Sequence, residues 1–253
     1  MSQKKLIVGN WKMNPETLEE AKVIVKKARN VAKKLSHTEV VVCPPTIFIS
    51  SCVSKWDKKS ISIGAQDVSI EDGGAHTGEV GARMLTDVGV SYVIVGHSER
   101  RKSGEKDGVV SQKALKALDA GMYAILCVGE EKRDESGTHY DVVRDQIKNS
   151  LAGIPSKYAK NIVVAYEPVW AIGAQEPMNP KEICEMAIFV RKVFSDVFSQ
   201  DSAMKVRVLY GGAVNFRNAA EIIQASQVDG LLVGRESVNM PGFKELLKAV
   251  DKI

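Results

Sequence analysis

The sequence predicts a (β/α)₈ barrel of eight parallel strands with outer helices, formed as a single domain over residues 1–253. Eight short runs rich in β-branched residues recur along the chain, and segments with helical periodicity separate them. The runs are almost continuously apolar, which is typical of parallel strands buried on both faces. No linker or low-complexity block divides the 253 residues. A doubly wound open sheet has the same alternation, and periodicity alone leaves that alternative open.

The elements follow one another in a regular order. Strands are expected at residues 5–10, 39–43, 60–65, 91–96, 123–129, 162–167, 206–212 and 229–234. Helical periodicity is clearest over residues 15–35, 107–121, 179–194 and 215–225. Pro15, Pro180 and Asn215 stand where helices are expected to begin, and Gly121 stands where one is expected to end.

Composition and charge exclude several classes of protein. The chain is 44% hydrophobic and 26% charged, with a net charge of +4, which is ordinary for a globular protein. The most basic segment, residues 21–35, has Val23, Ile24, Ala28, Val31, Ala32 and Leu35 at helical spacing. Its lysines are therefore interpreted as a solvated helix face, and no nucleic-acid partner is expected. A weak positive field still favours small anionic ligands.

The expected location is the cytoplasm. No apolar run is long enough to span a membrane, so no membrane partner is expected. The apolar stretch near the N-terminus, residues 6–8, is too short for the core of a signal peptide. The four cysteines are scattered and form no CxxC motif, which favours free thiols in a reducing compartment.

Polar residues and glycines follow the predicted strands at one end. In a (β/α)₈ barrel the chemistry lies at the carboxyl ends of the strands. Those ends carry Asn10, Trp11 and Lys12 after the first strand, residues 96–101 after the fourth, and Gly129 and Glu130 after the fifth. Glu167 follows the sixth strand, Gly211 and Gly212 the seventh, and Gly234 and Arg235 the eighth. Together these residues predict a functional site on one rim of the barrel.

Glu167 is the candidate general base. An isolated carboxylate after a strand is ordinarily a surface residue, but here the apolar segment 168–174 follows at once. Partial burial disfavours the charged form of a carboxylate and so makes it a better proton acceptor. Pro168 stiffens the start of the segment and Gly173 permits unusual backbone angles, which indicates a hinged lid that excludes water.

His97 is the candidate hydrogen-bond donor to a substrate oxygen. If a helix begins directly after it, the positive helix N-terminus disfavours the imidazolium and leaves a neutral ring. The surrounding GHSER resembles the G-x-S-x-G elbow of serine hydrolases, but Arg100 stands in place of the second glycine. A serine hydrolase is therefore disfavoured.

Lys12 is the candidate cation for an anionic substrate. If the first strand continues past Asn10, the side chains of Asn10 and Lys12 point to the same side. An unpaired lysine at the mouth of a barrel is costly, and Glu99 is its expected ion-pair partner. The glycines after the seventh and eighth strands are suited to binding phosphate through backbone N–H groups. No GxGxxG, P-loop or HExxH motif occurs, so a dinucleotide site, a Walker-type ATP site and a zincin metal site are not expected.

The motifs GNWKMN (9–14), GHSERR (96–101), AYEPVWAIG (165–173) and YGG (210–212) resemble those of the triosephosphate isomerase family, over nearly the whole chain. The resemblance implies a cofactor-free enzyme of glycolysis and gluconeogenesis that interconverts dihydroxyacetone phosphate and D-glyceraldehyde 3-phosphate. It implies that Glu167 moves the proton and that His97 polarises the carbonyl. Lys12 and Asn10, with Glu99 beside them, then bind the substrate and stabilise an enediolate. The phosphate is held by backbone N–H groups of Gly173, Ala213, Gly234 and Arg235. A homodimer is also implied, through the loop at 66–80, where Thr77 would insert beside the neighbouring subunit's site.

Three positions depart from the pattern of this family. Ala213 stands where serine is common, and Gln175 stands where the closed lid often has a glycine, so one lid contact is expected to be missing and Tyr210 to take its place. Arg235 stands in place of a glycine and adds a Cβ beside the expected phosphate position.

Two rival functions remain open from the sequence. The first is another phosphate-binding barrel, such as an aldolase or a biosynthetic isomerase. A Schiff-base lysine at a central strand end would favour an aldolase, and Lys12 on the first strand is the only rim lysine that can be placed. A non-catalytic barrel kept for binding is disfavoured because Glu167 and His97 are both present, although a fold alone does not fix a function.

Overall fold

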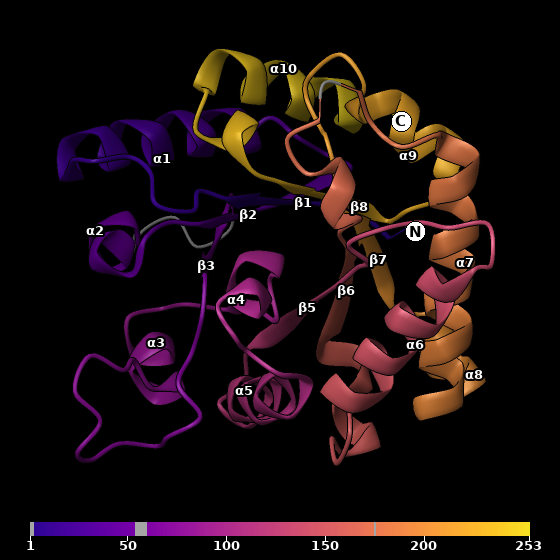
Figure 1. The fold of residues 1–253 in the computed structure, drawn as a ribbon. Coiled ribbons are helices and arrows are strands. Elements are labelled where there is room, and N and C mark those ends of the chain that lie inside the picture. The colour runs from indigo at the N-terminus through magenta and orange to yellow at the C-terminus, as the bar shows by residue number, and fades with distance from the viewer. Residues whose placement is uncertain (1–2, 54–59, 175) are drawn as a thin grey trace.

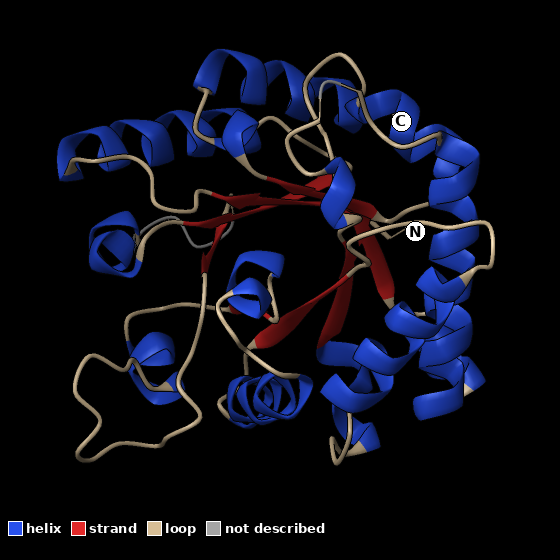
Figure 2. Ribbon diagram, in the orientation of Figure 1, coloured by secondary structure: helices blue, strands red, loops and turns tan. Residues whose placement is uncertain are grey.

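The structure is a computed structural model that describes residues 3–53, 60–174 and 176–253. Within these residues, strands alternate with helices along the chain (Figures 1 and 2). The strands are β1 (Lys5–Asn10), β2 (Thr38–Cys43), β3 (Ser62–Ala65), β4 (Tyr92–Val95), β5 (Tyr123–Val128), β6 (Ile162–Tyr166), β7 (Arg207–Tyr210) and β8 (Gly230–Val233). The α-helices are α1 (Leu18–Ala32), α2 (Ile49–Cys52), α3 (Ala82–Asp87), α4 (Ser98–Lys102), α5 (Asp107–Asp119), α6 (Thr138–Ser150), α7 (Pro180–Val197), α8 (Gln200–Ala203), α9 (Ala219–Ser226) and α10 (Met240–Asp251). Short 3₁₀ helices are η1 (Thr46–Phe48), η2 (Ser156–Asn161), η3 (Val169–Ala171) and η4 (Arg235–Ser237).

The strands close into a barrel in sequence order, from β1 to β8. Each strand pairs in parallel with the next, and β1 pairs with β8 to complete the circle. The helices surround this sheet, as Figure 2 shows. The predicted (β/α)₈ barrel is therefore confirmed, and the open-sheet alternative is wrong. No helix among the described residues is both long and apolar enough to cross a lipid bilayer.

Two of the predicted helix starts are wrong by three or four residues. Helix α1 begins at Leu18 rather than Pro15, because the side chain of Thr17 accepts a hydrogen bond from the Glu20 N–H and caps the first turn. Helix α9 begins at Ala219 rather than Asn215. Instead, the Asn215 side chain accepts from the Arg217 N–H at 2.8 Å, which forms a turn before the helix.

The other two helix boundaries are confirmed. Pro180 is the first residue of α7, where its missing N–H costs nothing, and the Asn179 side chain caps the Lys181 N–H at 2.9 Å. Gly121 follows α5 with φ = +86°, a left-handed conformation that suits glycine.

The buried face of α1 differs slightly from the predicted one. It consists of Ala21, Val25, Ala28 and Ala32, whereas Val23 is 48% exposed. The lysines of this helix lie outside, as predicted, so the basic segment is a solvated helix face.

Alternation along the strands decides which residues can reach the mouth of the barrel. One buried cluster fills the interior and includes Leu6 and Val8 of β1 and Val163 and Ala165 of β6. Because side chains on a strand alternate with period two, the next residue on the same side lies two positions further on. This places Asn10 and Glu167 at the carboxyl end of the interior.

Candidate active site

A cavity of about 440 Å³ opens at the carboxyl ends of the strands. Every residue predicted to have a catalytic or substrate-binding role lies in its wall: Asn10, Lys12, His97, Glu99, Glu167, Gly173, Ala213, Gly234 and Arg235. These residues come from the ends of β1, β4, β6, β7 and β8 and from the segment after β6. The structure therefore brings together the side chains that are predicted from sequence to form one site.

Glu167 lies at the base of this cavity and is only 3% exposed. Its backbone N–H donates to the Val128 carbonyl at 2.8 Å, which extends the β5–β6 pairing by one residue. Its Oε2 accepts from the Ser98 N–H at 3.4 Å, and its Oε1 lies 3.3 Å from Nε2 of His97. The candidate base and the candidate donor therefore lie next to one another in the site.

The buried thiol beneath Glu167 is not a reactive nucleophile. Cys127 has no solvent exposure. Burial, and then the nearby negative charge of Glu167, raise the pKa of the Cys127 thiol well above its ordinary value. A thiol held protonated in this way is inert, because the thiolate is the nucleophile.

Two glycines leave the space that Glu167 occupies. A Cβ on Gly129 would overlap with the backbone carbonyl of Glu167. A Cβ on Gly211 would lie 2.8 Å from Cγ of Glu167 and 3.4 Å from its Oε1. The glycine after β5 therefore accommodates the backbone at Glu167, and the glycine after β7 accommodates its side chain.

Replacing Gly211 by Ala is expected to lower kcat by about 10- to 100-fold, because displacing a reacting group by a fraction of an ångström spoils its alignment. KM for the substrate should change much less, since the displaced group is the base. Steady-state kinetics of Gly211→Ala beside the wild type measure both constants. Gly108→Ala is the matched control, because Gly108 lies inside α5 and a Cβ there would meet no atom within 4 Å. A kcat for Gly211→Ala equal to that of Gly108→Ala would contradict this steric role.

His97 is held in a single tautomer by the start of the next helix. It follows the turn at Gly96 and is the residue before α4, as the sequence predicted. Its Nδ1 accepts a hydrogen bond from the Glu99 N–H at 3.2 Å. A nitrogen that accepts an N–H cannot itself carry a proton, so the neutral ring has its proton on Nε2. That N–H points toward the side of the cavity where Glu167 lies.

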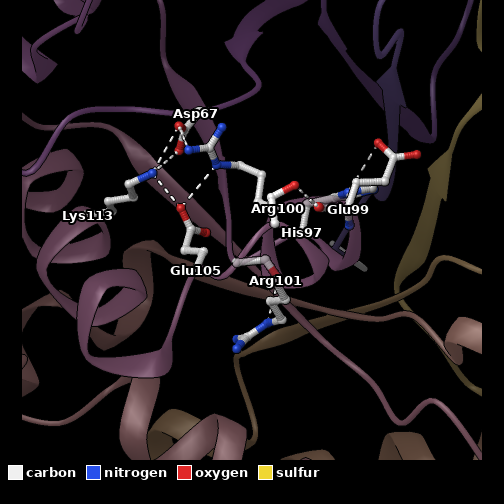
Figure 3. A network of polar contacts seen from close by, with 9 residues as sticks. Asp67, His97, Glu99, Arg100, Arg101, Glu105 and Lys113 are labelled. Atoms are coloured by element: carbon white, nitrogen blue, oxygen red, sulfur yellow. Dashed lines mark hydrogen bonds and ion pairs between the residues drawn. The ribbon is translucent and has the colours of Figure 1, made fainter.

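Helix α4, which positions His97, is tied to its neighbours by the ionic network in Figure 3. Arg100 is 2.8 Å from Asp67 on the loop after β3, and its Nε donates to Glu105 at 3.0 Å. Lys113 of α5 bridges the same two carboxylates. The side chain of Arg101 donates to the Gly96 carbonyl at 2.7 Å. The arginines of GHSERR therefore hold this helix in place behind the site.

Lys12 adopts an unusual backbone conformation at the edge of the cavity. Its φ is +53°, in the left-handed region that a residue with a side chain rarely occupies. Strand β1 ends at Asn10, so the condition that the strand continues to Lys12 is wrong. Two hydrogen bonds hold the turn instead: the Lys12 N–H donates to Oδ1 of Asn10 at 3.0 Å, and Gln66 Nε2 donates to the Lys12 carbonyl at 2.8 Å.

The predicted ion pair between Lys12 and Glu99 is present, with Nζ 2.6 Å from Oε1. Desolvation raises the pKa of Glu99, but the hydrogen bond and the charge of Lys12 outweigh it, and the pKa lies below its usual value. Glu99 therefore stays ionised and fixes the ammonium group of Lys12 at the rim.

The segment after Glu167 is anchored at both ends by buried polar groups. At its start, the indole N–H of Trp170 donates to Glu130 at 2.9 Å, and Glu130 also accepts from the Tyr166 hydroxyl. Burial, and then the charge of Glu130, raise the pKa of Tyr166, which stays a donor. At its end, the Met178 N–H donates to the Tyr210 hydroxyl at 3.2 Å.

Comparison with known proteins agrees with this geometry. The family model for triosephosphate isomerase matches residues 5–250. The triosephosphate isomerase of Endomicrobium trichonymphae is 40% identical over 248 residues, which cover 97% of this chain and 98% of that protein. The triosephosphate isomerase of Rhodopirellula baltica is 40% identical over 252 residues and covers 98% of both chains.

The chain belongs to the triosephosphate isomerase family. The predicted family and its isomerase activity are therefore confirmed.

Sequence reasoning missed two contacts that support the site of this enzyme. Gln66 joins the loop after β1 to the end of β2, because its Nε2 donates to the carbonyls of both Lys12 and Cys43. Glu130 is a predicted rim residue, but its part in anchoring the lid is not predicted. A single glutamine or glutamate on a loop has no local pattern, so only the fold reveals these contacts.

The three departures from the family pattern have different outcomes. Ala213 and Arg235 both line the cavity. Gln175 lies outside the described residues, so the expected loss of a lid contact stays a prediction. The Tyr210 hydroxyl accepts a hydrogen bond from the Met178 N–H, after the predicted lid segment, and its part in place of the missing contact stays a prediction.

Proposed function

We propose that the cavity binds a triose phosphate and interconverts dihydroxyacetone phosphate and D-glyceraldehyde 3-phosphate through an enediolate. The observation that carries the proposal is the pairing of a buried carboxylate and a neutral imidazole. Glu167 Oε1 and His97 Nε2 are 3.3 Å apart at the base of a cavity whose wall also contains Lys12. That spacing lets both groups reach adjacent atoms of one three-carbon substrate. We propose that residues 1–253 form the single domain that carries this activity.

The proton transfer is assigned to Glu167. A hydrogen next to a carbonyl is not acidic in water, so it needs a base within hydrogen-bond reach. Glu167 takes the proton from one carbon and returns it to the neighbouring carbon. The hydroxyl proton on the first carbon's oxygen passes to the oxygen of the former carbonyl, which balances the isomerisation. Its burial under the lid excludes water and strengthens its interactions with the substrate.

Stabilisation of the developing oxyanion is assigned to His97, Lys12 and Asn10. The Nε2 proton of His97 donates to the oxygen of the enediolate, where charge develops. Lys12, held by Glu99, supplies positive charge beside it, and Asn10 fixes the turn that carries Lys12. Glu99 thus acts by positioning Lys12.

Binding of the substrate's phosphate group is assigned to the part of the cavity wall that follows β6, β7 and β8. Backbone N–H groups of Gly173, Ala213, Gly234 and Arg235 are the proposed donors, because all four line the cavity and follow β6, β7 or β8. Gly173, with φ = +76°, lies in the lid segment with Ile172 and Ala174, which line the same cavity. Closure of this segment over the phosphate would complete the enclosure of the substrate.

A coupled assay tests this proposal directly. Purified enzyme converts D-glyceraldehyde 3-phosphate, and glycerol-3-phosphate dehydrogenase reduces the product as NADH absorbance falls. Excess EDTA in every buffer tests the proposed absence of a metal cofactor at the same time. Turnover that depends on enzyme concentration and survives EDTA supports both parts. No turnover in either direction would refute the proposed reaction.

We also propose a homodimer formed through the loop at 66–80, which carries Thr77. This loop protrudes from the body of the barrel between β3 and α3 (Figure 1). Around it, Met13 is 91% exposed, Ile47 80% and Met84 60%. Gln66 in this loop donates to the carbonyl of Lys12, the residue before Met13, and to that of Cys43 at the end of β2. Large apolar side chains exposed on adjoining segments favour a protein–protein interface.

Replacing Ile47 by Lys is expected to shift the dimer toward monomer, because a charge placed in an apolar interface must be desolvated. Size-exclusion chromatography with light scattering across a dilution series measures the shift. Met204→Lys is the matched control, since Met204 is 79% exposed but follows α8, near the amino end of β7. A monomeric wild-type enzyme, or equal masses for both variants, would contradict the proposed interface.

A cytoplasmic location is part of the same proposal. The structure contains free cysteines at positions 43, 52, 127 and 184, and three of them are buried. Free thiols in a folded protein are typical of a reducing compartment.

A further inference from the structure

The charged groups around the cavity do not by themselves favour an anion. The cations in its wall are Lys12 and Arg235, and the carboxylates are Glu99, Glu167 and Glu236. With His97 neutral, the carboxylates outnumber the cations. The proposed substrate carries a phosphate monoester, which is largely dianionic near neutral pH. The site therefore needs positive charge that its own carboxylates do not already neutralise.

Lys12 cannot supply all of the positive charge that a phosphate dianion needs. Its ammonium nitrogen is 2.6 Å from Glu99, so its charge is largely matched by that carboxylate. The paired ammonium group can still donate hydrogen bonds to a bound ligand. Its electric field at longer range is weak, because the carboxylate cancels most of it.

Glu236 is turned away from Arg235, although the two residues are adjacent. Its Oε1 accepts from Nδ2 of Asn239 at 3.3 Å. A Cβ on Gly242 would overlap with the same oxygen, so the carboxylate lies against the first turn of α10. A negative charge is favourable at that end of a helix, so the Glu236 carboxylate is held by α10 and not paired with Arg235, although the residue lines the same cavity.

Arg235 is the remaining cation. Arg235 is exposed, and its side chain makes no ion pair and no hydrogen bond with the described residues. Arg235 follows Gly234 directly. A Cβ on Gly234 would lie 3.7 Å from Cε of Lys12, so the chain just before Arg235 is close to the Lys12 side chain. We propose that the Arg235 side chain is a second cationic contact for the substrate's phosphate, one that attracts the dianion to the open site and sets its affinity.

This inference rests on the proposed function for its substrate, but it concerns a side chain rather than the backbone donors. A guanidinium offers a planar pair of N–H donors that matches two phosphate oxygens. Because Arg235 is exposed on the rim, its contribution should appear in association and in salt dependence more than in the chemical step. Its effect therefore falls on KM, while kcat stays within about twofold.

The test compares Arg235→Ala, Arg235→Lys and Arg235→Gly with the wild type at low and moderate ionic strength. Arg235→Ala is expected to raise KM for D-glyceraldehyde 3-phosphate by about tenfold at low salt, the lower end of electrostatic effects in charged clefts. The salt dependence of kcat/KM should flatten in the same variant. Arg235→Lys should retain part of the affinity, since it keeps the charge and loses the planar donor pair.

Arg217→Ala is the matched control. Arg217 is also exposed, follows the neighbouring strand β7, and has its guanidinium over the ring of Phe216, 5.4 Å from the ring centroid, outside the cavity wall. Its KM and salt dependence should equal those of the wild type. The phosphate-free substrate D-glyceraldehyde should be turned over equally by the wild type and by Arg235→Ala.

Two results would overturn the inference. In the first, Arg235→Ala and Arg217→Ala have the same KM and salt dependence, so that Arg235 is only a solvated residue. In the second, Arg235→Gly binds substrate more tightly than the wild type, so that the side chain obstructs the phosphate.

A binding measurement separates this inference from the proposed reaction. Isothermal titration with inorganic phosphate detects the anion site without any turnover. Phosphate binding that weakens about tenfold in Arg235→Ala supports the inference even in an enzyme that fails the coupled assay. Phosphate binding that is unchanged in Arg235→Ala refutes it even if the wild type is a fully active isomerase.

Discussion

Glu167→Gln should lower kcat for isomerisation by at least about 10²-fold, the scale of general-base catalysis, and leave KM nearly unchanged. Glutamine has the shape of glutamate, so it fits the space that Gly129 and Gly211 leave. Its amide oxygen can still accept the Ser98 N–H that now donates to Glu167 Oε2. What it loses is the basic oxygen, because an amide does not accept a proton from carbon. The loss should therefore appear in the chemical step rather than in binding.

Two measurements establish which step is affected. Steady-state kinetics in both directions give kcat and KM, and proton NMR follows the uptake of solvent deuterium into dihydroxyacetone phosphate. Both the turnover and the exchange should fall together, because one carboxylate performs both proton transfers. Exchange that continues at the wild-type rate in Glu167→Gln would show that another group is the base.

Two further variants control for charge and for position. Glu131→Gln removes an exposed carboxylate on the loop after β5 and should retain full activity. Glu167→Asp keeps a basic carboxylate but shortens its side chain by one methylene. It should therefore lose activity through misplacement, while its residual rate stays above that of Glu167→Gln.

The rim of the site could be predicted from sequence because each step rests on a local rule. Apolar runs identify strands, the parallel barrel puts their carboxyl ends on one face, and the period of two places Asn10 and Glu167 inside. The pairing of Lys12 with Glu99 follows from the cost of an unpaired charge, and it is present. None of these inferences needs the exact length of a helix.

The parts that sequence reasoning missed depend on contacts between distant loops. Gln66 supports Lys12 from a loop 54 residues away in the chain. The left-handed backbone of Lys12 follows from that contact and from Asn10, and nothing in the letters GNWKMN alone indicates it. The start of α1 differs from the predicted one because a threonine cap two residues after Pro15 determines the first turn.

His97→Ala carries the second large expected effect, a fall in kcat of about 10²- to 10³-fold, as for the loss of one donor to a developing oxyanion. The reason is geometric: Nδ1 already accepts the Glu99 N–H, so the single proton of the neutral ring is on Nε2, facing the cavity. His97→Gln, whose amide can donate from a similar distance, should recover part of the rate. His37→Ala is the control, because His37 is exposed before β2, at the opposite end of the barrel.

The decisive readout for His97 is the polarisation of the bound substrate. Infrared spectroscopy of dihydroxyacetone phosphate on Glu167→Gln, which holds the substrate without turnover, should show a carbonyl stretch shifted to lower frequency than in water. The shift should disappear when His97→Ala is added to that variant, while the substrate stays bound. Nitrogen NMR of the free enzyme should show one protonated ring nitrogen in His97, coupled to a single hydrogen. A doubly protonated ring would contradict the neutral tautomer. A carbonyl shift that survives without His97 would transfer the role of the donor to Lys12, which lies in the wall of the same cavity.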